Sequence, residues 1–242
     1  MQKSLKKHLL DVATAPYRSA GRSDYYWARG KLSRDPIFTA LLERGVFPDG
    51  ARVLDLGCGR GLLAAWLLAA EQMAAQGSWD APQAPPKALR FRGVELVARE
   101  AHCGNAALQP LYGDRVALSG GDMRSAGMEA IDAVAILDVL HYIPHAEQDQ
   151  LLDRIRAALG PVTILVNAAG KEVFRRFANI TFDEWRKIID INLNAEPGQY
   201  EIRVKRTNAE TTTEGAADKV MLLAITEYSD NTRPVNPPKP LA

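Results

Sequence analysis

The sequence predicts an α/β fold with a doubly wound, Rossmann-like parallel sheet that helices cover on both faces. Short apolar segments alternate with longer helix-like segments through residues 46–160, which is the pattern that such a fold produces. The first apolar segment runs directly into a Gly-x-Gly-x-Gly sequence at 57–61, as at the strand-to-helix turn of nucleotide-binding folds. The chain has 242 residues, 47% of them hydrophobic, which is enough for one large domain.

Four strands and three helices are expected in this part of the chain. Residues 62–75 are rich in Leu and Ala and contain no helix breaker, and residues 145–159 carry leucines and Ile155 at helical spacing. Residues 133–137 form a continuous apolar run, as expected of a central parallel strand. The other expected elements are strands at 52–57, 91–96 and 116–118 and a helix over about 98–108.

Two further segments leave alternatives open. Residues 76–90 contain three prolines and Trp79, which favours an exposed loop over a functional lid. Residues 15–32 are dense in aromatic and basic side chains. They predict either a cap that shapes a site for an acidic or acyl-type ligand, or an amphipathic helix packed at the sheet edge.

Residues able to bind a nucleotide-like ligand follow three of the predicted strands. Gly57, Gly59 and Gly61 can present backbone N–H groups to a ligand without a Cβ in the way. Asp55 precedes these glycines, and Glu95 closes the next strand, where its carboxylate can accept hydrogen bonds from ribose hydroxyls. Asp122 follows the third strand, and its carboxylate could accept a hydrogen bond from an adenine amino group.

These motifs, with Gly121-Asp122-Met123 and Leu137-Asp138-Val139-Leu140-His141-Tyr142, resemble those of class I S-adenosylmethionine-dependent methyltransferases over about residues 1–160. The resemblance implies that the three glycines line the methionine part of S-adenosylmethionine and that Asp55 orients its amino group. The other donor-binding residues that it implies are Glu95 and Leu96 at the ribose, Asp122 and Met123 at the adenine, and Asp138.

His141 and Tyr142 are the candidates for positioning or deprotonating a methyl acceptor, because they directly follow the fourth strand. The alternative is that they cap the next helix and pack over the cofactor. No metal site is assigned. In this family, N-terminal helices often cover the donor and shape the acceptor site, and both interpretations of residues 15–32 stay open.

The C-terminal part has a different character. Asn and Thr together occur three times in residues 1–160 and fifteen times in residues 161–242. Residues 161–195 resemble the middle of a short-chain dehydrogenase/reductase, and residues 196–240 resemble a bacteriophage tail-tip protein. The dehydrogenase resemblance lacks the Tyr-x-x-x-Lys motif, since Tyr200 and Lys205 are five positions apart. The chain is therefore interpreted as a possible chimera.

The expected order after residue 160 is strand 162–166, helix 181–193, strand 199–206 and strand 219–228. A class I methyltransferase ends in the same order, with the last two strands antiparallel. We therefore predict one seven-stranded sheet in a single domain spanning 1–230. Its parts would be a helical cap at 1–45, a donor-binding core at 46–160 and a C-terminal completion at 161–230, followed by a flexible tail at 231–242.

Composition excludes several function classes. A net charge of +1 argues against nucleic-acid binding through bulk positive charge, and no apolar run is long enough to span a membrane. Two cysteines and no visible signal peptide favour the cytoplasm. The predicted function is methyl transfer from S-adenosylmethionine to a small-molecule or acyl-type acceptor. The alternatives are an inactive chimeric scaffold that retains the donor pocket and an NAD(P)-dependent short-chain oxidoreductase.

Overall fold

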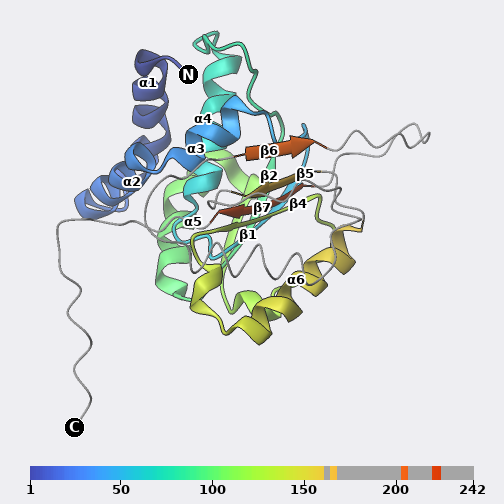
Figure 1. The fold of residues 1–242 in the computed structure, drawn as a ribbon. Coiled ribbons are helices and arrows are strands. Elements are labelled where there is room, and N and C mark those ends of the chain that lie inside the picture. The colour runs from blue at the N-terminus through green and yellow to red at the C-terminus, as the bar shows by residue number, and fades with distance from the viewer. Residues whose placement is uncertain (161–163, 168–202, 207–219, 225–242) are drawn as a thin grey trace, which may run out of the picture.

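The computed structural model describes residues 1–160, 164–167, 203–206 and 220–224 (Figure 1). Its strands are β1 (Arg52–Leu56), β2 (Arg90–Glu95), β3 (Val116–Gly120), β4 (Ala133–Leu137), β5 (Ile164–Asn167), β6 (Arg203–Arg206) and β7 (Val220–Ala224). They form one sheet in the order β3-β2-β1-β4-β7-β5-β6. The pairs from β3 through β5 are parallel, so the predicted α/β class with a parallel sheet is confirmed.

The helices in the described residues are α1 (Lys3–Thr14), α2 (Arg22–Arg34), α3 (Pro36–Glu43), α4 (Leu62–Ala75), α5 (Ala98–Tyr112) and α6 (His145–Leu159). Short 3-10 helices accompany them: η1 (Ala15–Arg18), η2 (Gly113–Arg115), η3 (Met123–Ser125) and η4 (Leu140–Tyr142). The predicted helices 62–75 and 145–159 agree with α4 and α6. α5 runs four residues beyond the expected end, with Pro110 in its last turn.

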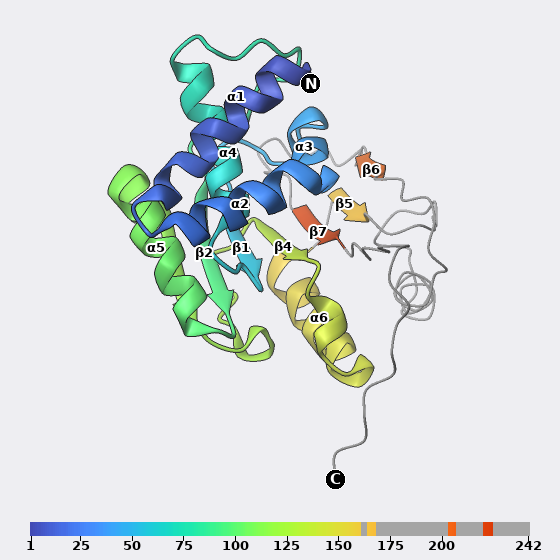
Figure 2. The same ribbon diagram turned by 90° about the vertical axis from the view of Figure 1, so that its left-hand side faces the viewer.

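Different helices cover the two faces of the sheet (Figure 2). On one face, Val53 and Phe91 belong to a buried cluster that includes residues of all five helices from α1 to α5. On the other face, Leu54 and Leu56 pack with the apolar side of α6, including Ile155. Because side chains alternate along a strand, β1 contributes to both clusters, as a central strand does.

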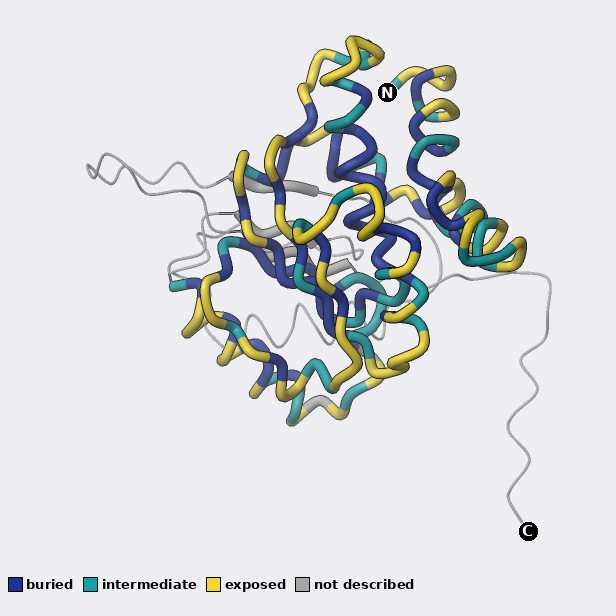
Figure 3. The backbone as a smooth tube through the Cα atoms, turned by 180° about the vertical axis from the view of Figure 1, so that it is seen from behind, coloured by how far each residue is buried: buried dark blue, intermediate teal, exposed yellow. Residues whose placement is uncertain are grey.

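α4 lies in the middle of the first cluster and is buried on nearly its whole circumference (Figure 3). Such a helix needs an outer layer to cover it, and α1 to α3 supply that layer. Trp66 of α4 is fully buried, and its indole N–H donates to the Phe38 carbonyl of α3 at 2.9 Å. The N-terminal helices are thereby joined to the sheet through the helix that follows the glycine turn.

The arrangement of the C-terminal strands differs from the prediction that the last two form an antiparallel pair. β6 is antiparallel to β5, whereas β7 lies between β4 and β5 and is parallel to both. The sequences of these strands give a physical reason. β7 reads Val-Met-Leu-Leu-Ala, an apolar run suited to an inner strand, and β6 reads Arg-Val-Lys-Arg, whose charges suit an edge.

The segment at 76–90 contains no helix or strand before β2 begins at Arg90. Its backbone is tied to the body of the protein, since the Lys87 N–H donates to Asp49 and the Ala88 N–H donates to Glu71, both at 2.8 Å. The predicted helix at 181–193 and tail at 231–242 lie outside the described residues. Within the described ranges, no helix has the length and apolarity needed to cross a membrane.

Candidate functional site

Two adjoining cavities lie at the carboxyl ends of β1, β2 and β4, where ligands of open α/β sheets bind. The first, of about 240 Å³, extends from the glycine turn toward α2 and α3, and the second, of about 320 Å³, extends toward η3. Gly57, Glu95, Val139 and Tyr142 line both cavities. Together the cavities have a size that is usual for small-molecule sites. No residue of the 76–90 loop lines either one, which favours the loop interpretation over the lid.

The turn after β1 requires glycine for steric reasons. Gly57 has a φ of +74°, and a Cβ there would lie 2.5 Å from Cγ2 of Val139. Gly61 has the same φ, and a Cβ there would lie 2.9 Å from Leu118. The Gly57 N–H donates to the Val94 carbonyl of β2 at 2.8 Å, so the turn is fixed against the neighbouring strand. The backbone can therefore approach a ligand closely without side chains in between.

Glu95 is held in place by backbone N–H groups. Its Oε2 accepts from Gly59 at 2.9 Å, and its Oε1 accepts from Val97 at 3.0 Å. A carboxylate has about four acceptor positions, so two remain for a ligand in the cavities that Glu95 lines. This geometry matches what binding of a ribose diol requires.

Asp55 lies at the end of β1 and lines the first cavity, although only 4% of the residue is exposed. Its carboxyl has no hydrogen-bond partner among the described residues. Burial and the nearby Glu95 raise the pKa of Asp55 to about 7. A buried carboxylate without a partner is costly, and a ligand cation placed beside it would stabilise the ionised form.

The wall of the second cavity combines exposed apolar side chains with an ion-paired carboxylate. Leu96 is 73% exposed, and Met123 packs against the α6 side of the core. Asp122 accepts from the Arg124 backbone N–H at 2.8 Å and from its guanidinium, which holds the pKa of Asp122 below its usual value. An adenine amino group at this wall would have to share the Asp122 carboxylate with Arg124.

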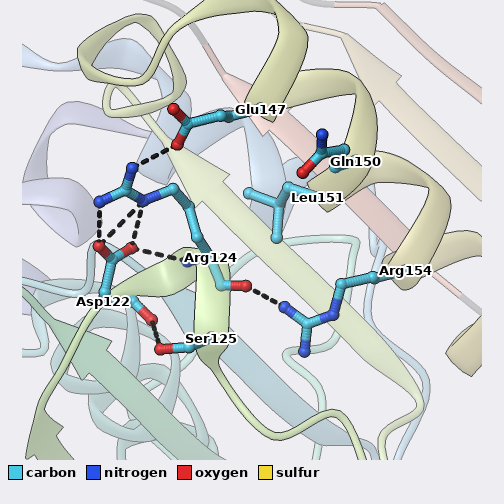
Figure 4. A pocket seen from close by; sticks show the side chains of 7 residues that line it. All are labelled: Asp122, Arg124, Ser125, Glu147, Gln150, Leu151 and Arg154. Atoms are coloured by element: carbon cyan, nitrogen blue, oxygen red, sulfur yellow. Dashed lines mark hydrogen bonds and ion pairs between the residues drawn. The ribbon is translucent and has the colours of Figure 1, made fainter.

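Arg124 also connects Asp122 to α6 (Figure 4). Its guanidinium forms an ion pair with Glu147 of α6, and Arg154 of the same helix donates to the backbone carbonyls of Arg124 and Ala126. These contacts fix η3 between β3 and α6. Asp122, Arg124, Glu147 and Arg154 also line a third cavity, of about 370 Å³, which no residue of the glycine turn lines.

On the side of α2 and α3, the first cavity is lined by residues that the sequence motifs did not single out, including Asp35 and Phe38. Lys31 Nζ lies 3.2 Å from Oδ2 of Asp138 and 3.4 Å from Oδ2 of Asp35. Asp138 has a φ of +60°, which is uncommon for a residue other than glycine and typical of functional sites. Asp35 also caps α3, and this Asp-Pro helix start was readable from the sequence, but its place beside the cavity was not.

Arg60, inside the glycine turn, joins α2 to the rest of the site. Its guanidinium pairs with Asp24 of α2 and Glu100 of α5, and it lies 4.5 Å from the ring centroid of Trp27. The hydroxyl of Tyr17 donates to the Arg60 carbonyl at 2.8 Å. Burial raises the pKa of Tyr17, so this hydroxyl stays a donor at neutral pH. The N-terminal helices thus contact the glycine turn directly.

The two candidate acceptor-side residues lie in η4, directly after β4. His141 is the middle residue of this turn. Tyr142 is 75% exposed and lines both cavities, so its ring stands where they meet. The structure therefore brings Tyr142 together with Asp55, Glu95 and Asp138 at one edge of the sheet.

Two family models match parts of the chain. Residues 39–116 match the family described as methionine biosynthesis protein MetW, and this stretch contains the glycine turn, Asp55 and Glu95. Residues 128–196 match the short-chain dehydrogenase family, which confirms the dehydrogenase resemblance of the C-terminal part.

A curated NADP-dependent (R)-specific alcohol dehydrogenase from Lentilactobacillus kefiri is 32% identical over 87 residues, which are 34% of this chain and 34% of that protein. The chain thus spans about a third of that relative's length.

Among solved structures, the chain is similar to magnesium protoporphyrin IX methyltransferase from Synechocystis PCC 6803 with bound SAM (20% identity, 72% of this chain and 77% of that chain, TM-score 0.43). It is also similar to the SAM-bound amino pentose methyltransferase CalS10 from Micromonospora echinaspora (29% identity, 58% and 52%, TM-score 0.38).

Proposed function

We propose that the chain is an S-adenosylmethionine-dependent methyltransferase that acts on a small-molecule acceptor. The observation that carries the proposal is the placement of Asp55 and Glu95 in one cavity on a glycine turn. A buried, unpaired carboxyl and a backbone-fixed carboxylate suit the two ends of an adenosyl amino acid, its ammonium and its ribose. The resemblance of the strand-end motifs to class I methyltransferases supports the same donor.

The described residues fit this donor. Asp55 would bind the ammonium, Glu95 the ribose hydroxyls, and the backbone of Gly57, Gly59 and Gly61 would face the methionine part. Leu96 and Met123 would form apolar walls around the adenine. The carboxylate of Asp122 would lie near the adenine amino group. When bound, S-adenosylmethionine supplies an electrophilic methyl group on a sulfonium.

Methyl transfer to a good nucleophile depends mainly on alignment of donor and acceptor. Tyr142 stands at the junction of the two cavities and is our candidate for positioning the acceptor. His141 remains a candidate base because it belongs to the same turn. Asp138 lines only the first of the two cavities, so it would lie beside the methionine part of the donor, where its carboxylate can also face the acceptor.

The proposal extends to the chain as a whole. We infer a single domain over 1–230 in which the C-terminal pieces, of chimeric origin, complete a methyltransferase-like sheet of seven strands. Cys58 and Cys103 are free thiols, which agrees with the reducing cytoplasm as the compartment. No nucleic-acid partner is proposed.

The similarity of residues 128–196 to short-chain dehydrogenases makes nicotinamide-dependent oxidoreduction the second candidate. Glu95 argues against NADP at the glycine turn, because its carboxylate would repel a phosphate on the adenosine ribose. A third possibility is a scaffold that binds the donor and transfers nothing.

Calorimetric titration separates the methyltransferase and oxidoreductase candidates. The proposal predicts binding of S-adenosylhomocysteine and no binding of NADH or NADPH. Glu95→Ala should weaken the adenosyl ligand by roughly 1–3 kcal/mol, because it removes a charged acceptor from two hydroxyls. Asp80→Asn, on the exposed 76–90 loop, is the matched control and should bind normally. Binding of a nicotinamide cofactor alone, or of neither ligand, would reject the methyltransferase proposal.

A further inference from the structure

The part of the first cavity that faces α2 and α3 carries an excess of negative charge. Once Asp55 and Glu95 are assigned to the donor, its remaining charged residues are Lys31, Asp35 and Asp138. One ammonium thus faces two carboxylates, at 3.2 and 3.4 Å. Asp35 also accepts a hydrogen bond from the Ile37 N–H at 3.0 Å, whereas in the described part of the chain the Asp138 carboxylate contacts Lys31 alone. Asp138 therefore has acceptor capacity to spare.

Two of the basic residues that suggested an acidic acceptor, Arg18 and Arg29, are paired outside the cavity. Arg29 pairs with Asp11 of α1 at 2.6 Å. Arg18 lies 4.8 Å from the ring centroid of Tyr25 and donates to its hydroxyl at 3.3 Å. Neither arginine lines the cavity. The positive charge of these two arginines is therefore used within the helical layer and is not presented to a ligand in this cavity, which leaves Lys31 as its one lining cation among the described residues.

The two carboxylates that share the Lys31 ammonium, those of Asp35 and Asp138, are partly or fully buried. Asp35 is 5% exposed, and the side chains of Asp138 and Lys31 are 28% and 40% exposed. Charges in such positions are screened by water only in part, so a second cation close to them would be stabilised. The neighbouring wall is aromatic: Trp27, Phe38 and Tyr142 line the same cavity. Aromatic faces favour apolar ligand groups and also cations.

We propose that this part of the cavity takes an arylalkyl amine as the methyl acceptor, bound as an ammonium beside Asp138 with its ring against the aromatic wall. For transfer, the Asp138 carboxylate takes one ammonium proton and passes it to water. The freed nitrogen lone pair then forms the new N–C bond to the methyl group, and the electrons of the broken S–C bond stay with S-adenosylhomocysteine, the leaving group. The inference rests on the methyltransferase proposal for the donor half of the site. It replaces the acidic or acyl-type acceptor that the composition of residues 15–32 suggested. The positive φ of Asp138 holds its carboxylate at the strand end, so the backbone itself positions the group that recognises the amine.

The test uses the full chain and two probes of similar shape and opposite charge, phenethylamine and hydrocinnamate. S-adenosylhomocysteine is titrated first, and each probe is then titrated with and without it. We expect phenethylamine to bind at least about tenfold more tightly than hydrocinnamate. Asp138→Asn should reduce amine binding about tenfold, since asparagine tolerates the positive φ and only the charge is lost.

Lys31→Met should change the amine affinity in the direction opposite to Asp138→Asn. It keeps an apolar stem and removes the competing ammonium, so amine binding should strengthen several-fold, whereas general damage to the cavity would weaken binding in both variants. Asp80→Asn is the control for a lost surface carboxylate. Preference for hydrocinnamate, equal binding of the probes, binding of neither, or an unchanged amine affinity in Asp138→Asn would overturn the inference. Absence of S-adenosylhomocysteine binding with a retained amine preference would instead reject the donor proposal.

Discussion

The buried carboxyl of Asp55 makes the stability of the protein depend on pH in a predictable direction. Burial and Glu95 raise its pKa from 3.8 to about 7, so the folded protein holds a proton that the unfolded chain releases. Stability from this group is complete below the unfolded pKa and is lost as the pH rises through the folded pKa. Each tenfold difference in proton affinity is worth about 1.4 kcal/mol, so the loss between about pH 5 and pH 8 is roughly 3 kcal/mol.

Asp55→Asn should remove this pH dependence. The amide is close in shape to a protonated carboxyl, and any cost of its buried N–H groups is the same at both pH values and cancels in the comparison. The neighbouring Cys58 thiol does not interfere, because burial raises its pKa and keeps it neutral over this range. Relative to wild type, the variant should therefore gain roughly 3 kcal/mol of unfolding free energy between about pH 5 and pH 8.

Urea denaturation followed by circular dichroism, at the two pH values and without ligand, measures the effect. Asp80→Asn removes an exposed carboxyl on the 76–90 loop and serves as the control, which should follow wild type. If Asp55→Asn and wild type changed in parallel between the two pH values, Asp55 would not be the buried, unpaired carboxyl described above, and the ammonium site assigned to it would lose its basis.

Three further outcomes are expected. Affinity for S-adenosylhomocysteine should rise with pH up to about 7 and then level off, because the ligand's ammonium requires ionised Asp55. Calorimetry over this pH range measures the effect, and a constant affinity would contradict the pairing of Asp55 with the ammonium. Gly57→Ala should cost about 2–4 kcal/mol in unfolding free energy, from both backbone strain and side-chain overlap, whereas Gly77→Ala, with a similar φ and open space, should cost only about 1–2 kcal/mol. Arg60→Met should cost about 1–3 kcal/mol by thermal or urea unfolding and expose α2 to limited proteolysis, and equal protease resistance would argue against its role in holding α2.

The placement of the proposed donor-binding residues at one edge of the sheet was predictable because it follows local rules. A parallel strand places its carboxyl end at one edge of the sheet, so Asp55, Glu95 and Asp138 could be assigned to that edge from sequence position alone. The contacts that modify these residues were not predictable. The pairing of Lys31 with Asp138 joins α2 to the turn after β4, and it depends on how α2 packs against the sheet.

The charge that the N-terminal helices present to the first cavity was also not predictable from the sequence, for a different reason. Their aromatic and basic composition indicated a cap over the site, and Trp27 and Lys31 do line the first cavity. Composition could not show that Arg29 is used within the helical layer and that two carboxylates surround Lys31. The net charge of a cavity wall depends on which ion pairs its residues form. A segment with many arginines can therefore contribute to a cavity whose wall is negatively charged.

The order of the C-terminal strands follows from burial more than from resemblance to any one family. An inner parallel strand is covered on both faces and needs an uninterrupted apolar run, which Val220–Ala224 provides and Arg203–Arg206 does not. The strand after β4 in the sheet order is therefore β7, which comes after β5 and β6 in the chain. The same rule explains how pieces resembling unrelated families can complete one sheet: each needs only the pattern of apolar and charged residues that its position requires. An apolar-to-charged change such as Leu222→Lys should then destabilise the sheet far more than Val204→Lys at the edge, and similar urea midpoints for the two variants would refute this account.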